Sequence, residues 1–113
     1  MRLPSADVAI IDEEKIIDYL LNPKHPDGFS KAIFFQNLGF STGLWQELAA
    51  ALRNVARNWP VTKIVESVHG RKYIIEGDIT SPLGRTAYIR SVWILDEGSD
   101  APRLVTAYPC NQL

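Results

Sequence analysis

The chain has 113 residues, of which 46% are hydrophobic and 10% aromatic, so it is long enough to bury a core as one domain. Its 12 basic and 13 acidic residues leave a net charge of -1, which gives no sign of nonspecific binding to nucleic acid or anionic membranes. Cys110 is the single cysteine, which excludes an intrachain disulfide and a cysteine metal site. Because no apolar run could span a bilayer and no signal peptide is recognisable, we expect one domain, residues 1–113, in a reducing cytoplasm.

The first residues, 1–11, predict an extended lead-in that covers an edge of the core with Val8, Ile10 and Ile11. A first helix is predicted from Asp12, a suitable N-cap residue, to a point before Pro23, because the residue before a proline avoids the helical conformation. The apolar positions of this helix fall at helical spacing: Ile16, Ile17, Leu20 and Leu21.

Two more helices are predicted before Pro60. Ser30 is a suitable N-cap for a short helix over residues 31–38. A third helix is expected to start at Ser41 or Thr42 and to end before Pro60. The predicted buried face of this third helix consists of Leu44, Leu48, Ala51, Leu52 and Val55.

After Pro60 the hydrophobic pattern changes from helical to alternating, which is typical of strands. The predicted strands are separated by turn residues and cover residues 61–68, 71–77, 85–95 and 103–108. We therefore predict an α+β domain, in which a helical half, residues 12–59, packs on a four-stranded antiparallel meander, residues 61–110.

The alternation in the last strand leaves the position of the helices open. Leu104, Thr106 and Tyr108 share one face, and Val105 and Ala107 share the other. If the helices cover the second face, Thr106 and Tyr108 line a cleft. If they cover the first face, the same two residues belong to the core.

Two sets of segments resemble a small bacterial domain family of unknown function, over about residues 5–110. The first set is YLLNPKHP (19–26), SKA (30–32) and FFQNLGF (34–40); the second is GRKY (70–73), VWI (92–94) and RLVTAYP (103–109). Members of that family occur as stand-alone proteins and as C-terminal domains of larger proteins. The resemblance identifies a family rather than an activity.

Helices followed by an antiparallel sheet that ends in Val-Thr-Ala-Tyr-Pro also resemble the superfamily of barnase, EndoU-type, colicin-type and RelE-type ribonucleases, many of which are toxins. These domains often combine a histidine on the helical side with basic residues and a Thr or Tyr on the last strands. The resemblance implies corresponding roles for His25, Lys31, Thr106 and Tyr108. Such toxins are commonly basic, so the net charge of -1 is a departure from the pattern.

The residues around the first turn allow two interpretations each. His25 has the chemistry of a general acid or base, but its ring can equally tie the loop to a helix end. Lys31 lies in the first turn of a predicted helix, where either an exposed charge or a bound anion fits. Arg90 lies between apolar residues of the longest strand, so it requires either an ion pair with Glu76 or Asp78, or a ligand.

Two hypotheses follow, and the sequence does not decide whether the protein is an enzyme. The first is a metal-independent ribonuclease-like, toxin-like domain that acts on RNA phosphodiesters without a cofactor; its predicted catalytic residues are His25, Lys31, Arg90, Thr106 and Tyr108. The second is a non-catalytic interaction domain that binds a cognate protein partner, such as an inhibitor or antitoxin, or forms a homodimer.

Overall fold

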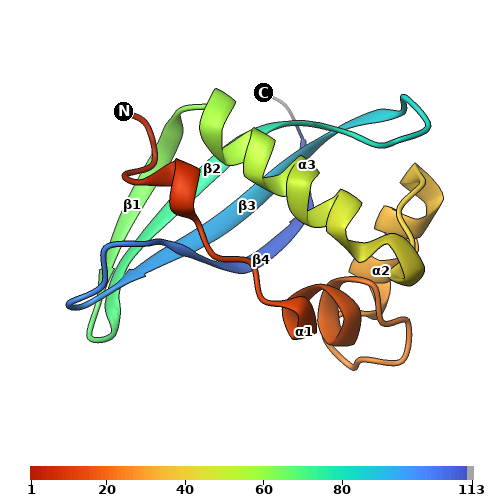
Figure 1. Cartoon of the computed structure of the whole chain (residues 1–113), viewed down its shortest axis with the longest axis horizontal. Helices are drawn as coiled ribbons and strands as arrows, with labels where there is room; N and C mark the ends of the chain where they lie inside the picture. Colours follow the sequence, from red (N-terminus) through yellow and green to blue (C-terminus); the bar gives the residue numbers. More distant parts are fainter. Residues whose placement is uncertain (112–113) are drawn as a thin grey trace.

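The computed structural model describes residues 1–111, and Figure 1 shows that the helices precede a single sheet. The prediction of three helices followed by a four-stranded antiparallel sheet is confirmed. The helices are α1 (Glu13–Lys15), which continues directly as the π-helical η2 (Ile16–Leu20), α2 (Phe29–Leu38) and α3 (Trp45–Asn58). Short 3-10 turns, η1 (Ala6–Val8) and η3 (Thr42–Leu44), precede the first and third of these.

The start of α2 differs from the prediction. The helix begins at Phe29, so Ser30 lies inside the first turn, and the N-cap position belongs to Gly28 without a side-chain cap. The helical hydrogen bonds already start at Gly28, whose carbonyl accepts from the Ala32 N–H at 2.8 Å. The His25 ring binds the N–H groups of Asp27 and Gly28 just before the helix. Gly28 also packs so closely on Tyr19 that a Cβ there would lie 2.3 Å from the Tyr19 carbonyl oxygen.

The sheet is a meander in the order β1 (Val61–Ser67), β2 (Gly70–Thr80), β3 (Thr86–Asp96) and β4 (Arg103–Pro109), with every pair antiparallel. The β2–β3 ladder is regular from end to end. Irregularities occur between Val61 and Lys63 in β1, and opposite Val92 and Trp93 in the β3–β4 pair. In β4 the partners of Val92 and Trp93 are Thr106 and Leu104, so Val105 is the extra residue of a bulge.

One face of the sheet forms the core with the helices. Its buried side chains come from β2, β3 and β4: Tyr73, Ile75, Ile79, Ile89, Ser91, Trp93, Leu104 and Ala107. The hydroxyl of Ser91 is satisfied there, because it accepts a hydrogen bond from Trp93 Nε1 at 3.0 Å and donates one to the Ile75 carbonyl at 3.3 Å. Figure 1 shows α3 lying across the sheet, while α1 and α2 lie together beyond the β4 side.

Because of the bulge, the residues of the last strand that share a face differ from the prediction. Leu104 and Ala107 both face the core although they are three residues apart, whereas strict alternation would place them on opposite faces. Thr106 and Tyr108 pair with Val92 and Arg90 and therefore share the face that points away from the core. No helix of the described residues packs on this second face, which we call the open face.

The N-terminal segment runs between the two edges of the sheet. The Val61 N–H donates to the Met1 carbonyl at 2.7 Å, and Ile10 forms a parallel bridge with Arg103. The prediction that Val8 and Ile10 cover a core edge is wrong, because they are 60% and 44% exposed. The buried apolar residues of the segment are Leu3 and Ala9, on either side of the η1 turn. Within residues 1–111 no helix has the length and apolar character needed to cross a membrane.

Candidate functional site

A cavity of about 420 Å³ lies between the N-terminal end of α2 and the edge strand β4. We call it the β4 cavity; its lining residues are Tyr19, Ser30, Lys31, Thr106, Tyr108 and Pro109. Three of the five residues that the sequence analysis selected therefore line one cavity, although α2 and β4 are more than sixty residues apart in the chain. The bulge at Val105 contributes to this arrangement, because it keeps Thr106 and Tyr108 out of the core.

Tyr19 connects the parts of this site, and the sequence analysis did not select it. Its hydroxyl is hydrogen-bonded to Thr106 Oγ1 at 2.9 Å, which ties the first helix to β4. The Nζ atoms of Lys31 and Lys15 lie 5.5 Å and 5.4 Å from the centre of its ring, within range of cation–π attraction. Its ring also meets the His25 ring edge-on at 5.0 Å. A half-buried tyrosine in a helical stripe carries no sequence signal that distinguishes it from a core residue.

The His25 side chain has a structural role in its loop. Its Nδ1 accepts hydrogen bonds from the backbone N–H groups of Asp27 and Gly28, both at 3.0 Å. A ring nitrogen that accepts carries no proton, so the neutral ring has its proton on Nε2 and can donate from that side. His25 does not line the β4 cavity. It lines a second hollow with Asp12, Glu14, Lys15, Asp18 and Tyr19, which we call the α1 hollow.

Lys31 retains free hydrogen-bonding capacity at the cavity wall. Its Nζ donates to the Asp27 carbonyl at 2.9 Å, and an ammonium group has three donors. Among residues 1–111, no carboxylate lines the β4 cavity, so none of these residues neutralises the charge of Lys31 there. With the hydroxyls of Ser30, Thr106 and Tyr108, the wall can supply several donors to one anionic group.

Arg90 lies next to the β4 cavity but is not part of its lining. Its Nε and Nη2 donate to Glu76 Oε2 at 3.1 Å and 2.9 Å, so of the two predicted ion-pair partners the structure selects Glu76. The guanidinium carbon also lies 5.9 Å from the centre of the Tyr108 ring. Contact with Tyr108 and then with Glu76 raises the pKa of Arg90. Arg90 thus links Glu76 on β2 to Tyr108 in the cavity wall.

Cys110 follows β4 and faces the same carboxylate. Its Sγ lies 3.6 Å from Glu76 Oε2. Burial, followed by the negative charge of Glu76, raises the pKa of the Cys110 thiol. The thiol is therefore held in its protonated, weakly nucleophilic form near neutral pH, and it does not have the character of a catalytic cysteine.

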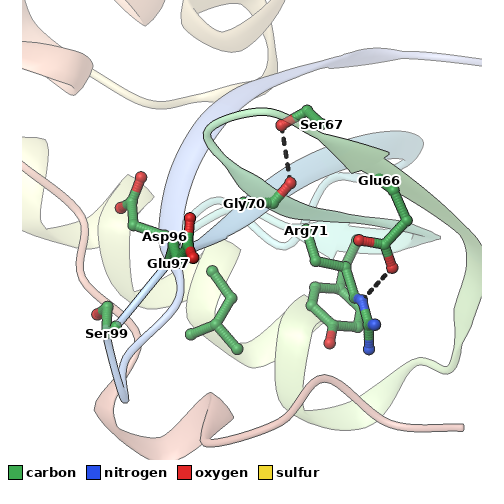
Figure 2. A pocket seen from close by; sticks show the side chains of 10 residues that line it. Glu66, Ser67, Gly70, Arg71, Asp96, Glu97 and Ser99 are labelled. Carbon is green, nitrogen blue, oxygen red and sulfur yellow. Dashed lines mark hydrogen bonds and ion pairs between the residues drawn. The ribbon is translucent and has the colours of Figure 1, made fainter.

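A hollow of different chemistry lies where the β1–β2 hairpin meets the end of β3, and Figure 2 shows it from close by. We call it the hairpin hollow; it measures about 360 Å³, and its charged lining residues are Glu66, Arg71, Asp96 and Glu97. Arg71 is paired with Glu66 at the rim, and Asp96 is paired with Arg103. Within residues 1–111, no three His, Cys, Asp or Glu side chains are grouped in a way that could hold a metal ion.

A solved structure with the same fold supports this description. A chain of a structure titled "Contact-dependent growth inhibition toxin - immunity protein complex from Klebsiella pneumoniae 342" matches with a TM-score of 0.71 and 22% sequence identity. The match covers 95% of the present chain and 97% of that chain. At this identity the likeness shows a shared fold.

The sequence itself identifies the family. No curated protein sequence matches the chain. Residues 2–111 match the sequence profile of DUF6883, described as a domain of unknown function. The expected membership of a family of unknown function is thereby confirmed: the chain belongs to the DUF6883 family.

Proposed function

We propose that this domain is a metal-independent ribonuclease of the toxin type, and that it cleaves RNA phosphodiesters in the β4 cavity. The observation that carries the proposal is the convergence of Lys31, Thr106 and Tyr108 on one cavity that no carboxylate of the described residues lines. Its fold, shared with a chain from a complex of a growth-inhibition toxin and its immunity protein, supports the same proposal.

The proposed reaction uses the substrate's own nucleophile. The ribose 2′-hydroxyl loses its proton and attacks the adjacent phosphorus, the bond to the 5′-oxygen breaks, and that oxygen takes up a proton. The products are a 2′,3′-cyclic phosphate and a free 5′-hydroxyl. Negative charge grows on the phosphate oxygens in the transition state, and fixed donors aimed at such charge are a strong source of catalysis.

In this proposal Lys31 supplies the positive charge, and the hydroxyls of Thr106 and Tyr108 supply neutral donors. Arg90 acts beside Tyr108, because Glu76 already occupies two of its donors. His25 is the proposed acid or base. While Nδ1 accepts the two backbone N–H groups, Nε2 carries the proton and can donate a hydrogen bond to the phosphate; proton uptake by the ring requires Nδ1 to release those N–H groups. The Tyr19 ring lies against His25 and its hydroxyl reaches Thr106, so Tyr19 is the connection between His25 and the cavity.

The first experiment is induced expression followed by analysis of total RNA, with wild type compared to His25→Ala and His25→Asn. An asparagine at this position keeps a side-chain acceptor for the N–H groups two and three residues later but lacks Nε2. Growth arrest with RNA cleavage by wild type alone supports the proposal and gives His25 a chemical role. Purified wild type is expected to cleave RNA in excess EDTA and to leave cyclic phosphate ends.

Two other outcomes would lead to different conclusions about His25 and about the nuclease proposal. Cleavage by His25→Asn but not by His25→Ala would reduce His25 to a residue that holds the loop. Intact RNA and normal growth with wild type would contradict the nuclease proposal.

The second proposal, a protein-interaction domain, is favoured by one specific observation. Glu76 neutralises Arg90, and both the hairpin hollow and the α1 hollow carry more carboxylates than cations. Such surfaces suit a basic protein partner rather than RNA. The complex whose chain shares this fold contains an immunity protein as well as a toxin, and a domain that binds and neutralises a toxin would have this charge. Intact RNA together with rescue of cells from a co-encoded toxin would support this second role.

A further inference from the structure

We propose that the open face of the sheet binds the RNA strand that continues from the β4 cavity, and that Lys63 on β1 contacts a phosphate of that strand. This inference rests on the proposed ribonuclease function. It assigns a substrate path to a surface that the cleavage step itself does not use.

The first argument is geometric. A hollow of about 290 Å³ on the open face is lined by Thr62, Lys63, Ile74, Glu76 and Arg90, and we call it the sheet-face hollow. Cross-strand pairing places Arg90 beside Tyr108, and Lys63 beside Ile74, on this face. Arg90 therefore belongs to both places: it lines the sheet-face hollow and its guanidinium contacts the Tyr108 ring in the wall of the β4 cavity.

The distance suits an extended strand. Adjacent strands lie about 4.8 Å apart, so β1 is about 14 Å from β4 across the sheet. A single RNA strand that leaves the β4 cavity over Tyr108 reaches Lys63 within a few nucleotides. The residues in between on this face include Ile74 and Val92, which are half-buried and apolar, and Glu76, whose carboxylate is paired with Arg90.

The second argument is charge. Counting residues 1–111, the lining of the β4 cavity has Lys31 and no carboxylate, and that of the sheet-face hollow has Lys63 and Arg90 against Glu76. Each of these two neighbouring places therefore has an excess positive charge. The hairpin hollow and the α1 hollow have an excess of carboxylates, so a polyanion is attracted to the open face and repelled from the other two.

The composition of the path also predicts how the strand is bound. Lys63 is exposed and takes part in none of the ion pairs found within residues 1–111, so it is free to contact a phosphate. Ile74 and Val92 offer no aromatic ring on which a base could stack. Binding along this path is therefore expected to depend on salt and to tolerate any base sequence.

The test uses 2′-O-methyl RNA, which lacks the attacking hydroxyl, as a dinucleotide and as an oligonucleotide long enough to cross the sheet. Dissociation constants are measured by fluorescence anisotropy at several salt concentrations for wild type, Lys63→Ala and Arg57→Ala. Arg57→Ala is the control, since it removes the same charge from α3, on the other side of the sheet, where Arg57 is paired with Asp7. We expect Lys63→Ala to weaken binding of the longer oligonucleotide several-fold, to lower its salt slope by about 1, and to leave the dinucleotide unaffected.

Two results would overturn the inference, and only the second of them would also overturn the proposed ribonuclease function. If wild type cleaves RNA but Lys63→Ala and Arg57→Ala bind the longer oligonucleotide equally well, the path is wrong and the proposed function stands. The open face would then be available to bind a protein partner. If wild type neither binds nor cleaves RNA, both proposals fail together.

Discussion

The β4 cavity and the hairpin hollow are similar in size but differ in how their charges are satisfied. In the hairpin hollow Arg71 is paired with Glu66, and Asp96 is paired with Arg103. In the β4 cavity Lys31 lines the wall with four hydroxyl-bearing side chains, and no carboxylate from residues 1–111 is part of the lining. A cation that is already neutralised has little left to offer a phosphate, so the comparison teaches that volume alone does not select the site. The predictions below test this contrast, from the largest expected effect to the smallest.

The largest effect is expected from Lys31→Ala. Removing a charged donor from the wall of a phosphate site should lower RNA cleavage by about a hundredfold, the order seen when one preorganised donor is lost. Lys24→Ala is the control, because it removes an equal charge from an exposed position of the preceding loop. Initial rates of cleavage of a fluorescent oligoribonucleotide measure the effect. Equal losses in both variants would point to long-range charge rather than to a phosphate contact.

Thr106→Val is expected to have an intermediate effect. Valine keeps the shape of the side chain but leaves the Tyr19 hydroxyl without its partner on β4. The hydrogen bond is partly buried, so urea unfolding should show a loss of about 1 kcal/mol. We expect cleavage to fall by about tenfold as Tyr19 loses its fixed position. A stability loss without any change in the cleavage rate would limit Thr106 to a structural role.

Arg71→Ala tests the other member of this comparison, the hairpin hollow. Arg71 is exposed, and its ion pair with Glu66 lies at the rim of the hairpin hollow. Exposed ion pairs contribute little to stability, and this hollow has no part in the proposed reaction. The melting temperature and the cleavage rate should therefore both equal those of wild type. A marked loss of cleavage in this variant would mean that the β4 cavity is not the active site.

The smallest change that we expect to measure concerns acid stability. The hydrogen bond from Arg103 lowers the pKa of Asp96 below its ordinary value of 3.8. A carboxyl group with a depressed pKa in the folded state stabilises the fold at pH values above its unfolded pKa, and this contribution is lost as the pH falls through the folded pKa. We expect Asp96→Asn to reduce the fall in melting temperature below about pH 4 without changing cleavage at neutral pH. An acid profile identical to wild type would contradict this assignment.

Local patterns in the sequence determined the elements of this fold. The change from helical to alternating hydrophobicity at Pro60 predicted the α+β order, and the observed helices and strands follow it. Helix periodicity, proline positions and glycine turns act over a few residues, so a single sequence reveals them. Lys31, Thr106 and Tyr108 were selected because the sequence resembles the ribonuclease superfamily, together with their positions at a helix start and on the last strand.

Tertiary structure alone decided which of these residues come together. The bulge at Val105 reverses the alternation of β4, and no local pattern distinguishes it from a regular strand. The pairing of Arg90 with Glu76 rather than with Asp78 depends on the β2–β3 register, in which Glu76 lies directly opposite Arg90. The contact of Tyr19 with Thr106 spans 87 residues, and such a contact is fixed by the packing of α1 against β4 and of η2 against α2 and α3. The sequence by itself therefore determined candidate residues of the site, and the packing of distant elements determined how they are arranged. The reason is that side-chain contacts between elements depend on strand register and on the face of each element rather than on spacing along the chain.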